Sequence, residues 1–260
     1  MNDITSIIDL NNHPINDDNY IKYCNASIKQ NSLLVLESFL SNRSLELILN
    51  EAKKLEDKAF YCKQKHTVLL NKKSDNLDKK DPLNQLMTSD KGCVPHDMIN
   101  QDSDLNTLYN SNIFKNFIKK VLNLEYVFPY VDNLSSINLN YYQEGQQLGW
   151  HFDNASFAIT LMIQSSPLGG EFEYITEGRD SNNNYINKEL ISKIINGNYM
   201  PNKLDVNNGT LILFYGRNYL HRVTPVKSKI PRILITLNYN EEDNIELSEN
   251  ARLTFFGRTN

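Results

Sequence analysis

A series of short β-rich segments between residues 136 and 237 constrains the fold of this chain most. Residues 136–142 alternate strictly between polar and apolar side chains, as a strand with two different faces does. The polar face carries Asn138, Asn140 and Tyr142, and the apolar face carries Ile137, Leu139 and Tyr141. Further strand-like runs cover residues 156–163, 170–175, 209–214 and 231–237. Short strands with long irregular connections are typical of a jelly-roll barrel.

The first half of the chain has a different pattern. Capping residues followed by apolar residues at helical spacing predict a helix over residues 41–52. Apolar residues at the same spacing predict a second helix over residues 113–122. Both helices are expected to support a sheet. Residues 71–104 are polar and rich in turn residues, which predicts a loop that covers the site. We therefore expect an α+β, mainly β fold in one domain over residues 1–260. Residues 1–125 are expected to be mainly helix and loop, and residues 126–260 to form the jelly-roll core, with an insert near 176–203 that contains a short helix.

Composition narrows the class of protein. The net charge is −4 and no long basic block is present, which argues against a nucleic-acid partner. Cys24, Cys62 and Cys93 form no CxxC pair, and their odd number favours a reducing compartment, the cytoplasm. The first residues lack a secretory pattern, and no apolar run reaches the roughly 18 residues of a membrane span, so no membrane partner is expected.

A His-x-Asp pair at residues 151 and 153 is the strongest candidate for chemistry. Residues at i and i+2 of an extended segment project from the same face, so His151 and Asp153 can reach one metal ion. His221, which follows the strand-like run 209–214, completes two histidines and one carboxylate, a set that suits non-haem Fe(II). Taken one at a time, His151, Asp153 and His221 could each be an ordinary surface or core residue. The strand-like surroundings favour the metal interpretation.

The segment 136–240 contains a longer series of motifs: Tyr142-x-x-Gly145, His151-x-Asp153, Gly169-Gly170-Glu171-Phe172, Gly209, His221-x-Val223-x-Pro225-Val226 and Arg232. In these residues it resembles the Fe(II)/2-oxoglutarate-dependent oxygenases. The resemblance implies a double-stranded β-helix core, with Fe(II), 2-oxoglutarate and O2 as cofactor and cosubstrates. It also implies that His151, Asp153 and His221 are the catalytic metal ligands and that Arg232 binds the distal carboxylate of 2-oxoglutarate. Tyr142 is expected either to reach the cosubstrate or to belong to the core.

Residues 149–154, 215–223 and 255–259 are similar to a narrower bacterial group of hydroxylases and halogenases of free amino acids such as lysine. Halogenases of that group carry a small residue in place of the metal-binding carboxylate. Because Asp153 holds that position here, the resemblance implies a hydroxylase. Lysine-acting members have a basic residue after a His-Pro pair, whereas the similar place here reads Pro95-His96-Asp97-Met98. This departure argues against lysine itself.

Four residues are candidates for contact with a small-molecule substrate, expected to be a free amino acid or a derivative. Thr236 and Asn238 share the face of Arg232 in the strand-like run. Phe255 and Phe256 either close the pocket or pack in the core. Three rival interpretations remain: a peptide or protein hydroxylase on the same scaffold, a non-catalytic jelly-roll binding protein, and a cupin-type isomerase that uses Zn or Mn.

Overall fold

The computed structural model describes residues 3–260. The α-helices are α1 Ile4–Ile7, α2 Asp18–Asn31, α3 Asn42–Leu55, α4 Asp104–Asn110, α5 Asn112–Leu122, α6 Lys188–Ile195 and α7 Glu249–Phe256. Short 3-10 helices cover Glu56–Lys58 (η1), Pro82–Asn84 (η2) and His96–Met98 (η3). None of the helices in this part of the chain has the length and apolar character that a membrane crossing requires.

The strands form two main sheets that face each other, so the mainly β, jelly-roll fold is confirmed. The larger sheet has the order β1-β12-β7-β14-β5-β3-β2, and the smaller has the order β11-β8-β13-β6. The larger sheet comprises β1 Leu33–Leu36, β2 Phe60–His66, β3 Met87–Val94, β5 Ile137–Tyr142, β7 Ala158–Gln164, β12 Leu211–Phe214 and β14 Arg232–Leu237. The smaller sheet comprises β6 Leu148–His151, β8 Phe172–Ile175, β11 Asn202–Leu204 and β13 Leu220–Val223. Two-residue strands form two further pairs, β4 Phe128–Pro129 with β15 Tyr239–Asn240 and β9 Arg179–Asp180 with β10 Tyr185–Ile186.

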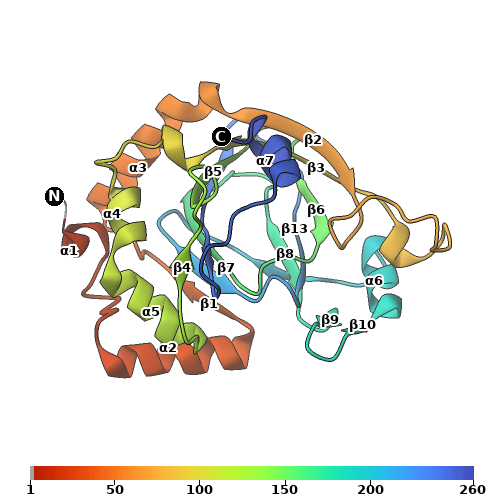
Figure 1. Cartoon of the computed structure of the whole chain (residues 1–260), viewed down its shortest axis with the longest axis horizontal. Coiled ribbons are helices and arrows are strands. Elements are labelled where there is room, and N and C mark those ends of the chain that lie inside the picture. The colour runs from red at the N-terminus through yellow and green to blue at the C-terminus, as the bar shows by residue number, and fades with distance from the viewer. Residues whose placement is uncertain (1–2) are drawn as a thin grey trace.

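A layer of helices covers the outer face of the larger sheet. Helices α1 to α5 lie together on one side of the strands in Figure 1, and α6 lies on the opposite side. The apolar stripe of α5 includes Phe114, Phe117 and Val121, which are fully buried in the same core as the outward side chains of β5 and β14. Burial of one such phenylalanine stabilises the fold by about 1.5–3 kcal/mol. This helical layer therefore holds the larger sheet rigid behind the site.

Strand β5 explains why the alternation of residues 136–142 is so strict. Ile137, Leu139 and Tyr141 belong to the core under the helices, as predicted. The opposite face carries Asn138 and Asn140, which line a cavity between the two sheets rather than facing solvent. All six residues of the strand are buried. The polar face of a buried strand therefore marks the interior of the barrel.

Residues 3–125 contain three strands of the larger sheet, β1, β2 and β3, in addition to the helices and loops that were expected. Strand β1 pairs with β12, and β3 pairs with both β2 and β5, so all three belong to the larger sheet. The prediction of a loop over 71–104 fails for β3, because its residues facing the site are polar and hide the strand pattern. The predicted loop is correct for residues 71–81, where the chain makes turns. Lys188 of α6 forms an ion pair with Asp81 at 2.7 Å, which ties this loop to the insert of residues 176–203.

Candidate active site

The structure brings His151, Asp153 and His221 together between the two sheets. His151 is the last residue of β6 and His221 lies opposite it in the neighbouring strand β13. The Nε2 atoms of His151 and His221 lie 3.4 Å and 3.6 Å from Oδ1 of Asp153. One ligand atom from each of the three residues lies within 4.8 Å of the others, an arrangement that fits a single metal ion.

Backbone carbonyl groups orient both imidazole rings. Nδ1 of His151 donates to the carbonyl oxygen of Gly149 at 2.8 Å, and Nδ1 of His221 donates to that of Tyr219 at 2.8 Å. Each ring therefore carries its proton on Nδ1 and directs the lone pair of Nε2 towards Asp153. A second hydrogen bond on the far nitrogen is the usual way in which proteins orient metal-binding histidines.

A buried relay supports the His151 side of the site. Nδ1 of His66 donates to the carbonyl oxygen of Thr67 at 2.8 Å, so its Nε2 accepts from the Ser89 hydroxyl at 2.5 Å. The Ser89 oxygen accepts the Gly149 N–H at 3.1 Å, and the carbonyl of Gly149 holds His151. The ring of His66 also contacts that of His151 edge-on, with 6.1 Å between centroids. Sequence reasoning missed His66 and Ser89, because neither belongs to a motif.

The protonation state of His221 suits a metal ligand. Burial lowers the pKa of His221 to about 4, so this ring is neutral at physiological pH. The carboxylate of Asp153 lies beside this ring, with its Oδ1 atom 3.6 Å from Nε2 of His221. A neutral imidazole beside a carboxylate supplies donor atoms that suit Fe(II).

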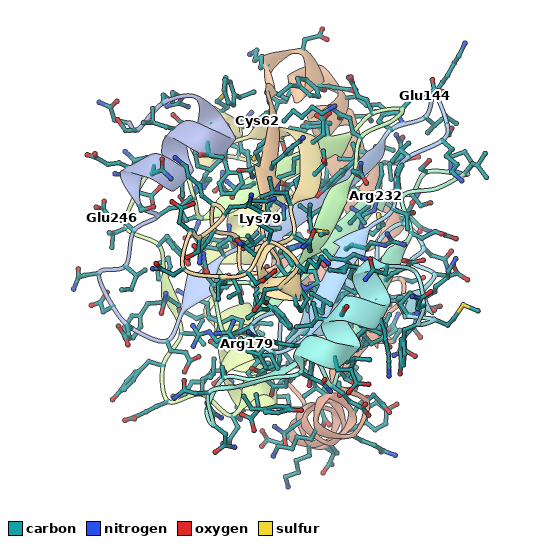
Figure 2. The ribbon with its side chains drawn as sticks, turned by 90° about the vertical axis from the view of Figure 1, so that its right-hand side faces the viewer. Cys62, Lys79, Glu144, Arg179, Arg232 and Glu246 are labelled. Atoms are coloured by element: carbon teal, nitrogen blue, oxygen red, sulfur yellow. The ribbon has the colours of Figure 1, made fainter. Side chains whose placement is uncertain are left out.

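Arg232 lies in the interior of the barrel, at the start of β14 (Figure 2). It is 2% exposed, and its Nε and Nη1 atoms have no hydrogen-bond partner among residues 3–260. Tyr142 lies opposite it on β5, and the guanidinium stands over the tyrosine ring at 5.4 Å from its centroid. A buried guanidinium without a partner is costly unless an anion completes it. The carboxylate of 2-oxoglutarate fits this requirement, because a guanidinium binds carboxylates through parallel hydrogen bonds.

Two other arginines near the site are already engaged. Arg222 forms an ion pair with the buried Glu173 at 2.7 Å. Arg217 donates to the carbonyl oxygen of Asn154 at 2.7 Å. Among residues 3–260, Arg232 is the arginine that lines the same cavity as the triad, so it is the one placed to bind a small-molecule carboxylate.

A cavity of about 300 Å³ contains the triad and Arg232. Four of the candidates for substrate or cosubstrate contact line it, Tyr142, Thr236, Asn238 and Phe255. Phe256 lies outside it, buried beside Cys93 and Leu134. Nδ2 of Asn238 donates to the carbonyl oxygen of Ser135 at 2.6 Å and to Oδ1 of Asn138 at 3.1 Å. Both hydrogen bonds use the nitrogen of this amide and neither uses its oxygen. Lys91 also lines the cavity, and sequence reasoning missed it because β3 was not predicted.

Comparison with known families decides which class of enzyme this geometry belongs to. A model of the family described as Halogenase D matches residues 16–254. The chain belongs to the Halogenase D family. No curated protein matches this Halogenase D member at a significant level.

Solved structures support the same fold. An oxidoreductase of the 2OG-Fe(II) oxygenase family from Burkholderia pseudomallei has a TM-score of 0.54 at 14% identity, over 85% of this chain and 91% of that chain. A prolyl hydroxylase from Trichoplax adhaerens, in complex with a hypoxia-inducible-factor peptide fragment, has a TM-score of 0.54 at 13% identity, over 87% and 91%. The non-haem α-ketoglutarate-dependent epimerase SnoN of nogalamycin biosynthesis has a TM-score of 0.57 at 10% identity, over 86% and 82%.

The family match, the fold and the triad agree. This Halogenase D member is a 2-oxoglutarate-dependent oxygenase, with Fe(II), 2-oxoglutarate and O2 as its cofactor and cosubstrates. Its family is named for halogenation, yet its candidate metal site contains the carboxylate of Asp153.

Proposed function

We propose that this enzyme hydroxylates an unactivated carbon of a small molecule, a free amino acid or an amino-acid derivative. The observation that carries the proposal is the Asp153 carboxylate beside Nε2 of His151 and His221. In the group that the sequence resembles, halogenases carry a small residue at this position, which leaves room for chloride on the metal. A carboxylate there favours hydroxylation.

In this proposal the chain's residues bind, orient and shield. His151, Asp153 and His221 would hold Fe(II), and Arg232 would hold the distal carboxylate of 2-oxoglutarate, with Tyr142 packed against the guanidinium. The bound iron, 2-oxoglutarate and O2 supply an oxidant able to remove hydrogen from an unactivated carbon. The buried walls of the cavity keep water away from this chemistry and fix the substrate's position.

The size and cover of the cavity favour a small molecule over a protein. Its volume of about 300 Å³ lies at the small end of the range for ligand pockets. Helix α7 and the segment before it cross the open end of the barrel in Figure 1, and Phe255 and Leu247 from this region line the cavity. Leu247 is held there by its backbone N–H, which donates to Asp132 at 3.0 Å. A peptide substrate needs an open groove at this place.

We further infer that residues 1–260 act as one oxygenase domain, because strands from the N-terminal part complete the larger sheet. The cysteines Cys24, Cys62 and Cys93 are all unpaired, which supports a reducing compartment such as the cytoplasm.

The test is a panel of free amino acids incubated with the enzyme, Fe(II), ascorbate, 2-oxoglutarate and O2. We expect succinate formation that depends on one class of amino acid, and a product heavier by one oxygen atom. A synthetic proline-containing peptide serves as the competing substrate, because one structural neighbour is a prolyl hydroxylase with a bound peptide. Turnover of the peptide without turnover of any free amino acid would favour the peptide hydroxylase.

A further inference from the structure

Lys91 is a cation in the substrate cavity that the proposed chemistry does not use. It lies in β3 at the position opposite Cys62 of β2, a residue labelled in Figure 2. Its Nζ atom donates to Oδ1 of Asn140 at 2.6 Å and stands over the ring of Phe255 at 5.3 Å from the centroid. These two contacts hold the ammonium group at the cavity wall.

The cavity offers Lys91 no carboxylate of its own. Among residues 3–260, Asp153 is the only acidic residue that lines the cavity, and it belongs to the metal site. No ion pair of Lys91 is present in that part of the chain, whereas Lys63 on the same hairpin lies 3.7 Å from Asp90. An ammonium group has three N–H donors, and the hydrogen bond of Lys91 to Asn140 uses one of them, so the group can also donate to an anion.

Arg232 does not compete for the same anion. Arg232 starts β14 on one side of β5, and Lys91 belongs to β3 on the other side, so β5 separates their backbones. In the proposed function the carboxylate of 2-oxoglutarate completes Arg232. The second anion must therefore come from the substrate.

The remaining walls are uncharged, and this limits the rest of the substrate. Hydroxyl and amide groups of Thr160, Thr236 and Asn238 line the cavity, with an apolar remainder that includes Phe172 and Phe214. Amide oxygens can accept hydrogen bonds from an α-ammonium group that lies next to its own carboxylate. A further ammonium group at the far end of a side chain would be desolvated without a counterion, which is strongly unfavourable.

We propose that Lys91 binds the carboxylate of the substrate, and that the substrate has no cationic side chain. This inference rests on the proposed oxidation of a free amino acid. It names Lys91 as the residue that determines which amino acids enter, and it excludes lysine and ornithine in favour of chains with uncharged ends.

The test is calorimetric binding under nitrogen to the enzyme loaded with Fe(II) and 2-oxoglutarate. The probes are L-norleucine, L-norleucinamide and L-lysine, which share one carbon chain and differ in the carboxylate or in the terminal ammonium. We expect norleucine to bind about tenfold to a hundredfold more tightly than the amide, as loss of a charge-assisted hydrogen bond predicts. Lysine is expected to bind more weakly than norleucine.

Three variants separate recognition from a merely structural role. Lys91→Met should bind the acid and the amide equally, because the coupling between Lys91 and the carboxylate is gone. Lys91→Arg should restore the preference for the acid. Lys65→Met, which removes an exposed lysine from the same hairpin, should behave as wild type.

Binding of lysine as tight as that of norleucine, or failure of norleucine to bind, would overturn the inference. Full discrimination between acid and amide in Lys91→Met would overturn it as well. The comparison of norleucine, norleucinamide and lysine uses the wild-type protein, so its outcome does not depend on whether a variant folds. Because binding is measured without O2, these outcomes are independent of whether the proposed hydroxylation occurs.

Discussion

A Cβ atom at Gly216 would lie 1.8 Å from Oδ2 of Asp153. The N–H of Asp153 also donates to the carbonyl oxygen of Gly216 at 2.9 Å. The backbone of residue 216 is thus the wall against which the carboxylate of the candidate metal site rests. No residue with a side chain fits there unless Asp153 moves.

The Gly216→Ala substitution should therefore displace the Asp153 carboxylate. We expect affinity for Fe(II) to fall at least about tenfold, the range seen when groups that orient metal ligands are changed. Equilibrium dialysis against Fe(II) under nitrogen measures this. In an Asp153→Gly background the same substitution should have no further effect, because the colliding side chain is absent. Additive losses in the double variant would show that Gly216 acts on something other than Asp153.

The relay from His66 through Ser89 predicts a second effect on metal binding. Ser89→Ala removes the acceptor of the Gly149 N–H and the donor to His66, and it should weaken Fe(II) binding about tenfold. Ser89→Thr keeps the hydroxyl and should bind Fe(II) nearly as wild type does. Dialysis well below the melting temperature keeps the loss of stability out of the comparison. Equal affinities in the two variants would mean that the relay does not orient His151.

Arg232→Leu should have opposite effects on the free and the cosubstrate-bound protein. Without 2-oxoglutarate the variant should melt higher than wild type, because an unpaired buried charge is removed. Binding of 2-oxoglutarate should weaken by about 2–5 kcal/mol, and with it the stabilisation that this ligand gives. Thermal melts with and without 2-oxoglutarate measure both. Arg222→Leu is the control, because it removes the 2.7 Å ion pair to the buried Glu173, leaves that carboxylate with Lys203 at 3.6 Å, and should destabilise the protein without changing its response to 2-oxoglutarate.

The adjacent aromatic residues Phe255 and Phe256 should differ sharply when each is replaced by alanine. Phe255 lines the cavity and Phe256 is 5% exposed in the core. We expect Phe256→Ala to reduce the free energy of unfolding by about 3–5 kcal/mol. Phe255→Ala should instead raise the KM for the substrate with a smaller loss of stability. Urea denaturation and steady-state kinetics measure the two effects. A large loss of stability in Phe255→Ala together with a raised KM in Phe256→Ala would contradict the assignment of Phe255 to the cavity.

Much of the core was predictable because the spacing of apolar residues along a helix or strand indicates which face is buried. The spacing of residues 113–122 matches α5, and the short helix expected in the insert near 176–203 is α6. The series of strand-like runs predicted the fold class. The places of His151, Asp153 and His221 beside these runs predicted that the three side chains meet. The structure agrees because residues of neighbouring strands meet at one place in the barrel.

The parts that could not be predicted lack a local signal. Strand β3 contains Asp90, Lys91 and Gly92, which obscure alternation, and only its pairing with β2 and β5 reveals it. Lys91, Ser89 and His66 gain their places from that pairing. Gly216 is required by a contact with a residue 63 positions earlier (216 minus 153), and such a contact leaves no trace in spacing.

The central claim is that Asp153 makes this member of a family named for halogenation a hydroxylase, and the mass of the product tests it most directly. The wild-type enzyme is supplied with Fe(II), 2-oxoglutarate and an accepted amino acid in concentrated chloride under ¹⁸O2. We predict a product that carries one labelled hydroxyl oxygen and no chlorine, and loss of this product in Asp153→Gly, because two imidazoles alone hold Fe(II) weakly. A chlorinated product from the wild-type enzyme, or a hydroxyl group without label, would contradict the role assigned to Asp153.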